Sequence, residues 1–186
     1  MGRVSQAQAQ ENRRRVVETA SRLLREQGTH LSVADLMKSA GLTHGGFYKQ
    51  FASKEALIDE ATAHAFAELA QHHKDGLDQY AGQRDAAQRA LIDAYLSAEH
   101  RDSPADGCPA AALVTDMARD GGETEARRAY TQGVGDFADF LAAKDQDGIT
   151  RLCTMLGALV LSRATNGTPL SDEILTAART ALIGTN

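Results

Sequence analysis

The stretch that decides the fold lies at residues 40–57 and reads AGLTHGGFYKQFASKEAL. Gly41 interrupts an apolar segment, and Thr43 stands where a side chain commonly caps a new helix. In the helix that follows, Phe47 and Phe51 are four residues apart and share one face, which we expect to point into a core. The other face then carries small or polar residues, namely His44, Gly45, Gly46, Tyr48 and Lys49.

Two further helices are predicted before this stretch. The first runs from about 11 to 27, because its apolar residues recur at intervals of three and four and Gly28 ends it. The second is short and begins near Ser32, which has the position of a capping residue. Two short helices joined by a glycine-containing turn form a helix-turn-helix, whose second helix enters the DNA major groove. The sequence therefore predicts a helix-turn-helix motif at about 32–51.

The outward face of the predicted helix at 44–51 is unusual for an element that serves stability alone. Each interior glycine costs about 0.5–1 kcal/mol relative to alanine, so Gly45 and Gly46 indicate that something approaches the backbone closely. The approaching group could be the wall of a DNA groove or a phosphate. Lys49 could then donate a hydrogen bond to guanine or to phosphate, and Tyr48 could donate one to phosphate. The alternative interpretation is that the two glycines mark a loop and that Lys49 is a solvated charge.

Residues 40–57, together with the helix and the capped segment before them, resemble the signature of the TetR family of bacterial transcriptional regulators. The resemblance covers about 55 of the 186 residues, with order and spacing intact. It implies phosphate contacts by Thr43, Tyr48 and Lys54, and a DNA-backbone contact by Ser32. It implies that four residues lie along base edges: His44, Gly45, Gly46 and Lys49. The chain departs from the family pattern just before Ser32, where the 29–31 segment is one residue short.

Charge is distributed unevenly along the chain. The formal net charge is −5, yet residues 1–55 hold nine Lys/Arg and five Asp/Glu, so they carry +4 and the other 131 residues carry −9. A basic end on an acidic body favours one part meeting a polyanion. The run Arg13-Arg14-Arg15 is either a basic arm that approaches DNA or the solvated start of a helix.

The whole chain is predicted to be all-α, because proline is scarce and no stretch alternates as a strand does. Capping residues and glycine or proline breaks delimit the remaining helices. We expect an N-terminal helix-turn-helix domain at 10–69 and a helical ligand-binding and dimerisation domain at 70–186. The expected helices after the motif are 54–74, 84–101, 109–119, 123–144, 150–165 and 171–183.

The resemblance also implies a homodimer and an effector pocket. The apolar helices at 150–165 and 171–183 are the expected intersubunit bundle, so that the homodimer forms through about 150–183. Two-fold symmetry then predicts a near-palindromic operator on double-stranded DNA. The alternative is that these helices pack only within one subunit. Candidate ligand-binding residues, which could equally be plain core, are Phe66, Leu69, Tyr95, Cys108, Met117, Tyr130 and Phe137.

Cys108 is the residue of most chemical interest outside the motif. Pro109 suits the first position of a helix, which puts Cys108 at the N-cap, where the helix dipole stabilises a thiolate. This pattern permits an alternative function, a thiol- or electrophile-sensing regulator of the same fold. The other interpretation is a small buried thiol that shapes the pocket.

Several function classes find no support in the sequence. There is no nucleophile elbow, no phosphate-cradling loop and no carboxylate pair at catalytic spacing, so we do not expect an enzyme. No cofactor and no metal site are expected, and the absence of a signal peptide or an apolar span predicts a cytoplasmic protein without a membrane partner. The predicted function is a ligand-regulated transcriptional regulator, a repressor that a small-molecule effector releases from its operator.

Overall fold

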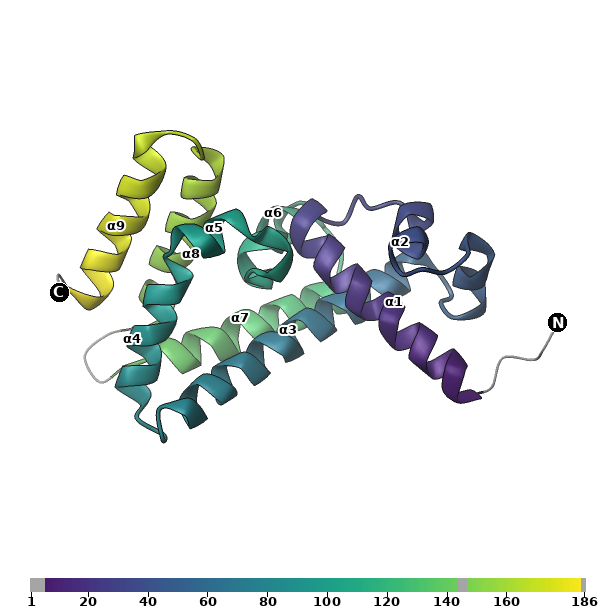
Figure 1. The fold of residues 1–186 in the computed structure, drawn as a ribbon, viewed down its shortest axis with the longest axis horizontal. Coiled ribbons are helices and arrows are strands. Elements are labelled where there is room, and N and C mark those ends of the chain that lie inside the picture. The colour runs from purple at the N-terminus through teal and green to yellow at the C-terminus, as the bar shows by residue number, and fades with distance from the viewer. Residues whose placement is uncertain (1–5, 144–146, 185–186) are drawn as a thin grey trace.

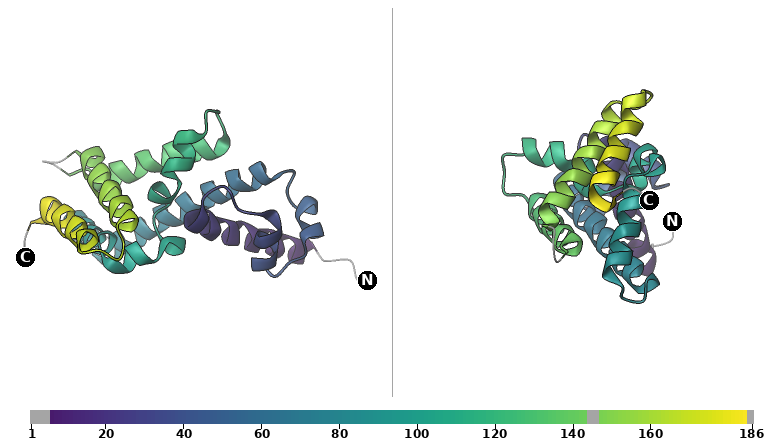
Figure 2. Two further views of the ribbon diagram at one scale, coloured as in Figure 1. Left: turned by 90° about the horizontal axis from the view of Figure 1, so that it is seen from above. Right: turned by 90° about the vertical axis from the view of Figure 1, so that its left-hand side faces the viewer.

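The computed structural model describes residues 6–143 and 147–184, and within them every regular element is a helix. The molecule is elongated: the small N-terminal helices occupy one end and the last two helices the other (Figure 1). Two long helices, α3 (Lys54–Gln79) and α7 (Glu125–Leu141), run side by side along the length and connect the two ends (Figure 2). The all-α prediction is confirmed.

The N-terminal end contains α1 (Gln6–Gln27), α2 (Val33–Ser39) and the 3₁₀ helix η1 (His44–Lys49). The Ser32 hydroxyl accepts hydrogen bonds from the backbone N–H groups of Ala34 and Asp35, so the predicted cap is present. Two predictions need correction. Helix α1 starts five residues earlier than expected, because the Gln/Ala segment before residue 11 consists of good helix formers. The third helix is a 3₁₀ helix, and the Thr43 side chain makes no capping hydrogen bond.

Helix α3 begins as predicted, with the Ser53 hydroxyl accepting from the Ala56 N–H. It ends later than predicted, at Gln79 rather than near 74, because a single glycine, Gly76, does not stop a helix whose neighbours favour it. The predicted domain boundary between residues 69 and 70 therefore falls within one continuous helix.

The C-terminal body is built from the remaining helices. The predicted helix at 84–101 is two helices, because Leu96 ends the first and the Ser97 hydroxyl caps the second by accepting from the His100 N–H. The other four predicted helices are present with ends that differ by up to three residues. The elements are α4 (Arg84–Tyr95), α5 (Ala98–Asp102), the 3₁₀ helix η2 (Pro104–Asp106), α6 (Pro109–Arg119), α7, α8 (Gly148–Ala164) and α9 (Pro169–Ile183).

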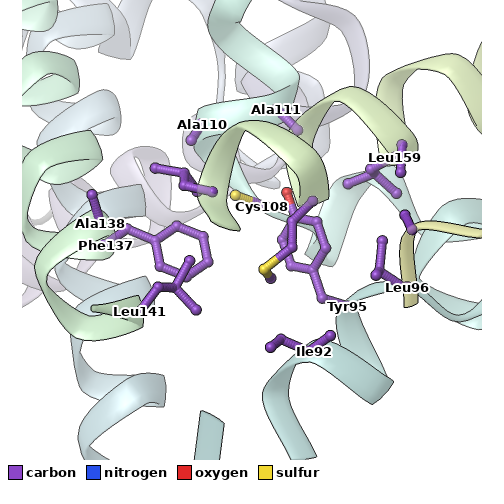
Figure 3. Packing of buried hydrophobic residues seen from close by; sticks show 14 of the residues in the cluster. Ile92, Tyr95, Leu96, Cys108, Ala110, Ala111, Phe137, Ala138, Leu141 and Leu159 are labelled. Carbon is purple, nitrogen blue, oxygen red and sulfur yellow. The ribbon is translucent and has the colours of Figure 1, made fainter. Parts of the chain in front are cut away.

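Two hydrophobic clusters form the core, one at each end of the molecule. The larger one lies among α4, α6, α7 and α8 and includes Tyr95 and Phe137 (Figure 3). The N-terminal one gathers residues of α1, α2, η1 and α3. Helix α6 contributes to both, since Ala110 and Ala111 belong to the first and Leu113 and Met117 to the second. A movement of α6 would therefore change the packing of both cores.

Among the described helices, none combines the length and apolar character that crossing a membrane requires.

Candidate DNA-binding surface and effector cavity

The helix-turn-helix is held by aromatic residues that point inward. Phe47 is fully buried and Phe51 nearly so, and their rings stack with centroids 5.5 Å apart. Leu36 and Met37 of α2 lie in the same cluster, which fixes α2 against η1. Gly41 between the two helices has a φ of +69°, a left-handed conformation that glycine adopts without strain. The turn and the inward-facing aromatic pair thus set the orientation of η1.

The opposite face of η1 is open to solvent. Tyr48 is 67% exposed, and Thr43, His44, Gly45 and Lys49 are exposed beside it. A Cβ at Gly45 would meet no other atom of the described chain within 4 Å, and its φ is not left-handed. Packing and backbone conformation within the described chain therefore give no reason for a glycine at 45.

Two helices begin close to η1 along the chain, α2 before it and α3 after it. Ser32 is exposed at the start of α2, and its oxygen accepts the cap bonds, so its own hydrogen is directed elsewhere. Lys54 is the first residue of α3, next to the capping Ser53. Helix N-termini carry partial positive charge and free N–H groups, which suit phosphate. Ser32 and Lys54 thus lie at the starts of α2 and α3, whereas Thr43, Tyr48 and Lys49 lie on η1 or directly before it.

Arg13 does not belong to a basic arm. Its Nη1 and Nη2 donate to the Glu60 carboxylate at 2.5 and 2.6 Å, and its guanidinium lies 4.5 Å from the centroid of the Phe51 ring. Arg14 pairs with Glu11 and Glu18 on its own helix. Of the two earlier interpretations of the arginine run, the structure supports an ordered helix start, in which Arg13 ties α1 to α3 and to the aromatic pair.

A cavity of about 800 Å³ lies where α3, α4, α5, η2 and α6 meet, and we call it the interhelical cavity. Four of the predicted ligand residues line it: Leu69, Tyr95, Cys108 and Phe137. Arg25 of α1 also lines it, which no sequence pattern indicated, because only the packing of α1 against α3 turns this residue inward. The size falls within the range typical of small-molecule sites.

A second, more apolar groove of about 530 Å³ runs between α3 and α7 and shares Leu69 and Phe137 with the cavity. Phe66 lines this groove, as does His73, a buried imidazole whose ring lies against Phe137 and Phe140 with centroids 4.5 and 4.6 Å away. Burial lowers the pKa of His73 to about 4, because the charged imidazolium would lose its hydration there. The imidazole is therefore neutral at physiological pH.

Two predicted ligand residues lie elsewhere. Met117 packs in the N-terminal core. The Tyr130 hydroxyl donates to the Ala110 carbonyl at 2.8 Å, and its ring meets Phe66 edge to face. Met117 is thus a buried core residue, and Tyr130 is a partly buried residue that packs against both clusters.

Cys108 occupies the N-cap of α6, as its sequence position suggested, but it is buried. Burial raises the pKa of its thiol, and this effect outweighs the N–H groups of Ala110 and Ala111 that favour a thiolate. Its neighbour Tyr95 has its pKa raised well above the usual value by burial. The thiol is thus protonated near neutral pH and behaves as a small apolar group.

The outer face of α8 and α9 carries exposed hydrophobic residues. Four of the seven large hydrophobic residues that stand exposed in the described chain lie here, namely Ile149, Val160, Leu161 and Leu170. Other apolar residues of α8, such as Leu152, Met155 and Leu159, are buried in the core of their own subunit. Exposed apolar patches of this kind mark interaction surfaces.

The exposed η1 after a glycine turn, held by an inward aromatic pair, defines a helix-turn-helix protein. Residues 16–61 match the sequence model of the bacterial regulatory proteins of the tetR family. Within the chain, residues 16–61 are thus a domain of the TetR family of bacterial regulatory proteins, and most of the helix-turn-helix lies in this domain. No curated protein sequence matches the chain.

Solved structures of the same fold cover nearly the whole chain. NemR from E. coli, in its reduced form, has a TM-score of 0.74 and 20% identity over 92% of this chain and 95% of that chain. A TetR transcriptional regulator from Chloroflexus aurantiacus has a TM-score of 0.71 and 21% identity over 95% and 94%. AibR in complex with isovaleryl coenzyme A and operator DNA has a TM-score of 0.61 and 16% identity over 94% and 100%. At these identities the likeness concerns the fold alone.

Proposed function

We propose that this protein is a homodimeric repressor that binds a near-palindromic operator and releases it when a small organic effector enters the interhelical cavity. The observation that carries the proposal is the η1 element, whose Phe47 and Phe51 are buried while Tyr48 and Lys49 face solvent. An element with this anchoring and this free face fits the major groove.

The proposed DNA contacts divide by chemistry. Ser32, Thr43, Tyr48 and Lys54 bind phosphates, since hydroxyl and ammonium groups beside helix N-termini suit anionic oxygens. Along the base edges lie His44, Gly45, Gly46 and Lys49, of which Lys49 has the donor for guanine O6 or N7. The free Thr43 hydroxyl, which makes no capping bond, supports its assignment to a phosphate.

The proposed dimer forms through the outer face of α8 and α9. Ile149, Val160 and Leu161 on α8 and Leu170 on α9 supply apolar surface that water would otherwise cover. Burial of such surface favours association by about 25 cal/mol per Å² before the entropic cost of binding. Packing α8 and α9 against the same pair of a second copy gives a four-helix bundle with two-fold symmetry.

The proposed effector site is the interhelical cavity, because Leu69, Tyr95 and Phe137 give it an apolar lining and Arg25 and His100 give it polar groups. AibR, which has the same fold, was solved with a small-molecule ligand and operator DNA together. Since α6 packs in both cores, a ligand that shifts α6 would alter the N-terminal end as well. Effector and DNA affinities are then coupled reciprocally.

The test is fluorescence anisotropy with a labelled DNA fragment from upstream of the protein's own gene. Changing Tyr48→Ala and Lys49→Ala together should weaken specific binding by roughly 100-fold, because phosphate and base contacts are lost in both subunits. The matched control changes Tyr80→Ala and Lys74→Ala, the same residue types exposed at the other end of α3. Equal affinity of the two double variants would refute the DNA-binding surface.

A second candidate function is thiol sensing through Cys108 with the same DNA-binding end. One observation favours it: NemR, whose fold is similar, was described in its reduced form. The raised pKa of the buried Cys108 thiol opposes it, since the thiolate is the reactive species. A Cys108→Ser variant that loses DNA release by a thiol oxidant or a thiol-alkylating reagent, while it still binds DNA, would support thiol sensing; unchanged release would exclude it.

A further inference from the structure

Arg25, near the C-terminal end of α1, is a buried cation in the wall of the interhelical cavity. Its side chain is only 9% exposed, and its Nη2 donates to Glu68 Oε2 at 3.1 Å. Its Nε is buried and has no hydrogen-bond partner among the described residues. A guanidinium has five N–H donors, and leaving them unused in a buried place is unfavourable. Arg25 is therefore poised for an additional acceptor.

A second polar group in the same wall also lacks a strong partner. The Tyr95 hydroxyl is fully buried, and within the part of the chain that the structure describes its neighbour is the Cys108 thiol, a weak hydrogen-bonding group. Figure 3 shows the hydroxyl end of Tyr95 directed to the side where Cys108 lies. Two buried donors, one of them charged, thus line one cavity.

The acidic groups of the cavity lie on its solvent side. Glu68 is 46% exposed, and Glu99 and Asp106 are exposed. His72 is exposed, whereas the ring nitrogens of His100 are engaged: Nδ1 contacts the Tyr95 carbonyl at 2.8 Å and Nε2 accepts from the Cys108 N–H at 3.3 Å. Burial also lowers the pKa of His100, so its imidazole is neutral. The only charge that the described lining buries is the positive charge of Arg25.

We propose that the effector is an organic anion whose acid group binds Arg25 in place of Glu68, with a further hydrogen bond from the Tyr95 hydroxyl. Its apolar body lies against Leu69, Leu91 and Phe137, which line the same cavity. Charge-assisted hydrogen bonds between a guanidinium and a carboxylate are among the strongest in proteins, and frequently bidentate. The inference rests on the proposed function in one respect, that this cavity is the effector site.

The same exchange gives the effector a route to the DNA-binding end. Glu68 of α3 contacts two residues of α1, since it accepts from Arg25 and, at 3.4 Å, from the Ser21 hydroxyl. An acid that takes Arg25 removes one of these ties between α1 and α3. Helix α1 packs against α2 and α3 in the N-terminal core, so a displacement of α1 changes the orientation of the helix-turn-helix relative to α3. Arg25 is thus the link between ligand charge and DNA release.

Isothermal titration calorimetry on the full chain tests this with three probes that share one apolar tail: octanoate, octan-1-ol and octylamine. Octanoate should bind more tightly than the other two, and Arg25→Gln should weaken its binding roughly 10- to 100-fold while leaving octan-1-ol unchanged. Glu68→Gln should strengthen octanoate binding, because it removes the competing carboxylate. The matched control is Arg119→Gln, an exposed arginine on α6.

The opposite signs expected for Arg25→Gln and Glu68→Gln separate a binding role from loss of folding, and circular dichroism checks each variant. Equal binding of the three probes, tighter octylamine binding, octanoate binding by Arg25→Gln as in the wild type, or no binding of any probe would each overturn the proposal. DNA binding is measured separately by fluorescence anisotropy. If the protein binds DNA but the calorimetric titrations fail as described, only the proposal of an anionic effector is overturned. Failure of the Tyr48/Lys49 test overturns the DNA-binding surface only.

Discussion

Gly133 on α7 should be intolerant of even one added methyl group. A Cβ at this position would lie 2.0, 2.4 and 2.6 Å from three atoms of the Phe66 ring, whereas carbon atoms in contact are about 3.5–4.0 Å apart. The ring must therefore shift by about 1.5 Å. Phe66 is 7% exposed and packs edge to face on Tyr130, so a shift of its ring disrupts that packing. We therefore expect Gly133→Ala to push α3 and α7 apart, the two long helices that pack side by side.

The magnitude follows from two opposing effects. Overpacking of this kind costs about 1–3 kcal/mol, and alanine regains about 0.5–1 kcal/mol through its better helix propensity. We expect a net loss of about 1–2 kcal/mol in the free energy of unfolding. With a urea m-value of about 2 kcal/mol/M, the unfolding midpoint falls by about 0.5–1 M. Urea titrations followed by circular dichroism, at one fixed protomer concentration, measure it.

The control lies two residues away on the same helix. A Cβ at Gly135 would meet no atom of the described chain within 4 Å, so Gly135→Ala should raise the free energy of unfolding by about 0.5–1 kcal/mol. In a Phe66→Leu background the loss from Gly133→Ala should shrink, because the smaller side chain yields. If Gly133→Ala and Gly135→Ala shifted the midpoint in the same direction, the close approach of α3 and α7 would be wrong.

Three further predictions concern the DNA face, the dimer face and the buried imidazole. Gly45→Ala should leave the urea midpoint unchanged or higher yet weaken DNA binding by about tenfold, since each subunit brings one added Cβ to the groove; unchanged anisotropy would contradict it. Leu161→Glu should yield monomers by size-exclusion chromatography with light scattering, whereas Val114→Glu, at an exposed site on α6, should not. Because the folded pKa of His73, about 4, lies below that of the unfolded chain, the free energy of unfolding should fall as the pH drops from about 6.5 to 4, by at most about 1.4 kcal/mol per pH unit. His73→Phe should flatten that decline in urea titrations at pH 7 and 5; equal slopes would show that His73 is protonated in the fold.

The helix-turn-helix was largely predictable from the sequence because its determinants are local. The spacing of Phe47 and Phe51 selects one face, Gly41 supplies a left-handed turn, and Ser32 and Ser53 cap the helices on either side. Each of these acts within a few residues along the chain. The 3₁₀ geometry of η1 escaped prediction, since a short helix is shaped by its packing as much as by its sequence.

Only the tertiary structure decided the rest of the functional site. Met117 was a candidate for the ligand site or for plain core, and its place in the N-terminal core was decided by packing, because a helical stripe does not specify its partner helix. The inward position of Arg25 depends on α1 crossing α3 beside Glu68, 43 residues further along the chain. Sequence alone thus determined the helix-turn-helix, whose geometry is local, whereas the cavity and its buried charge arise from contacts between segments far apart in the chain.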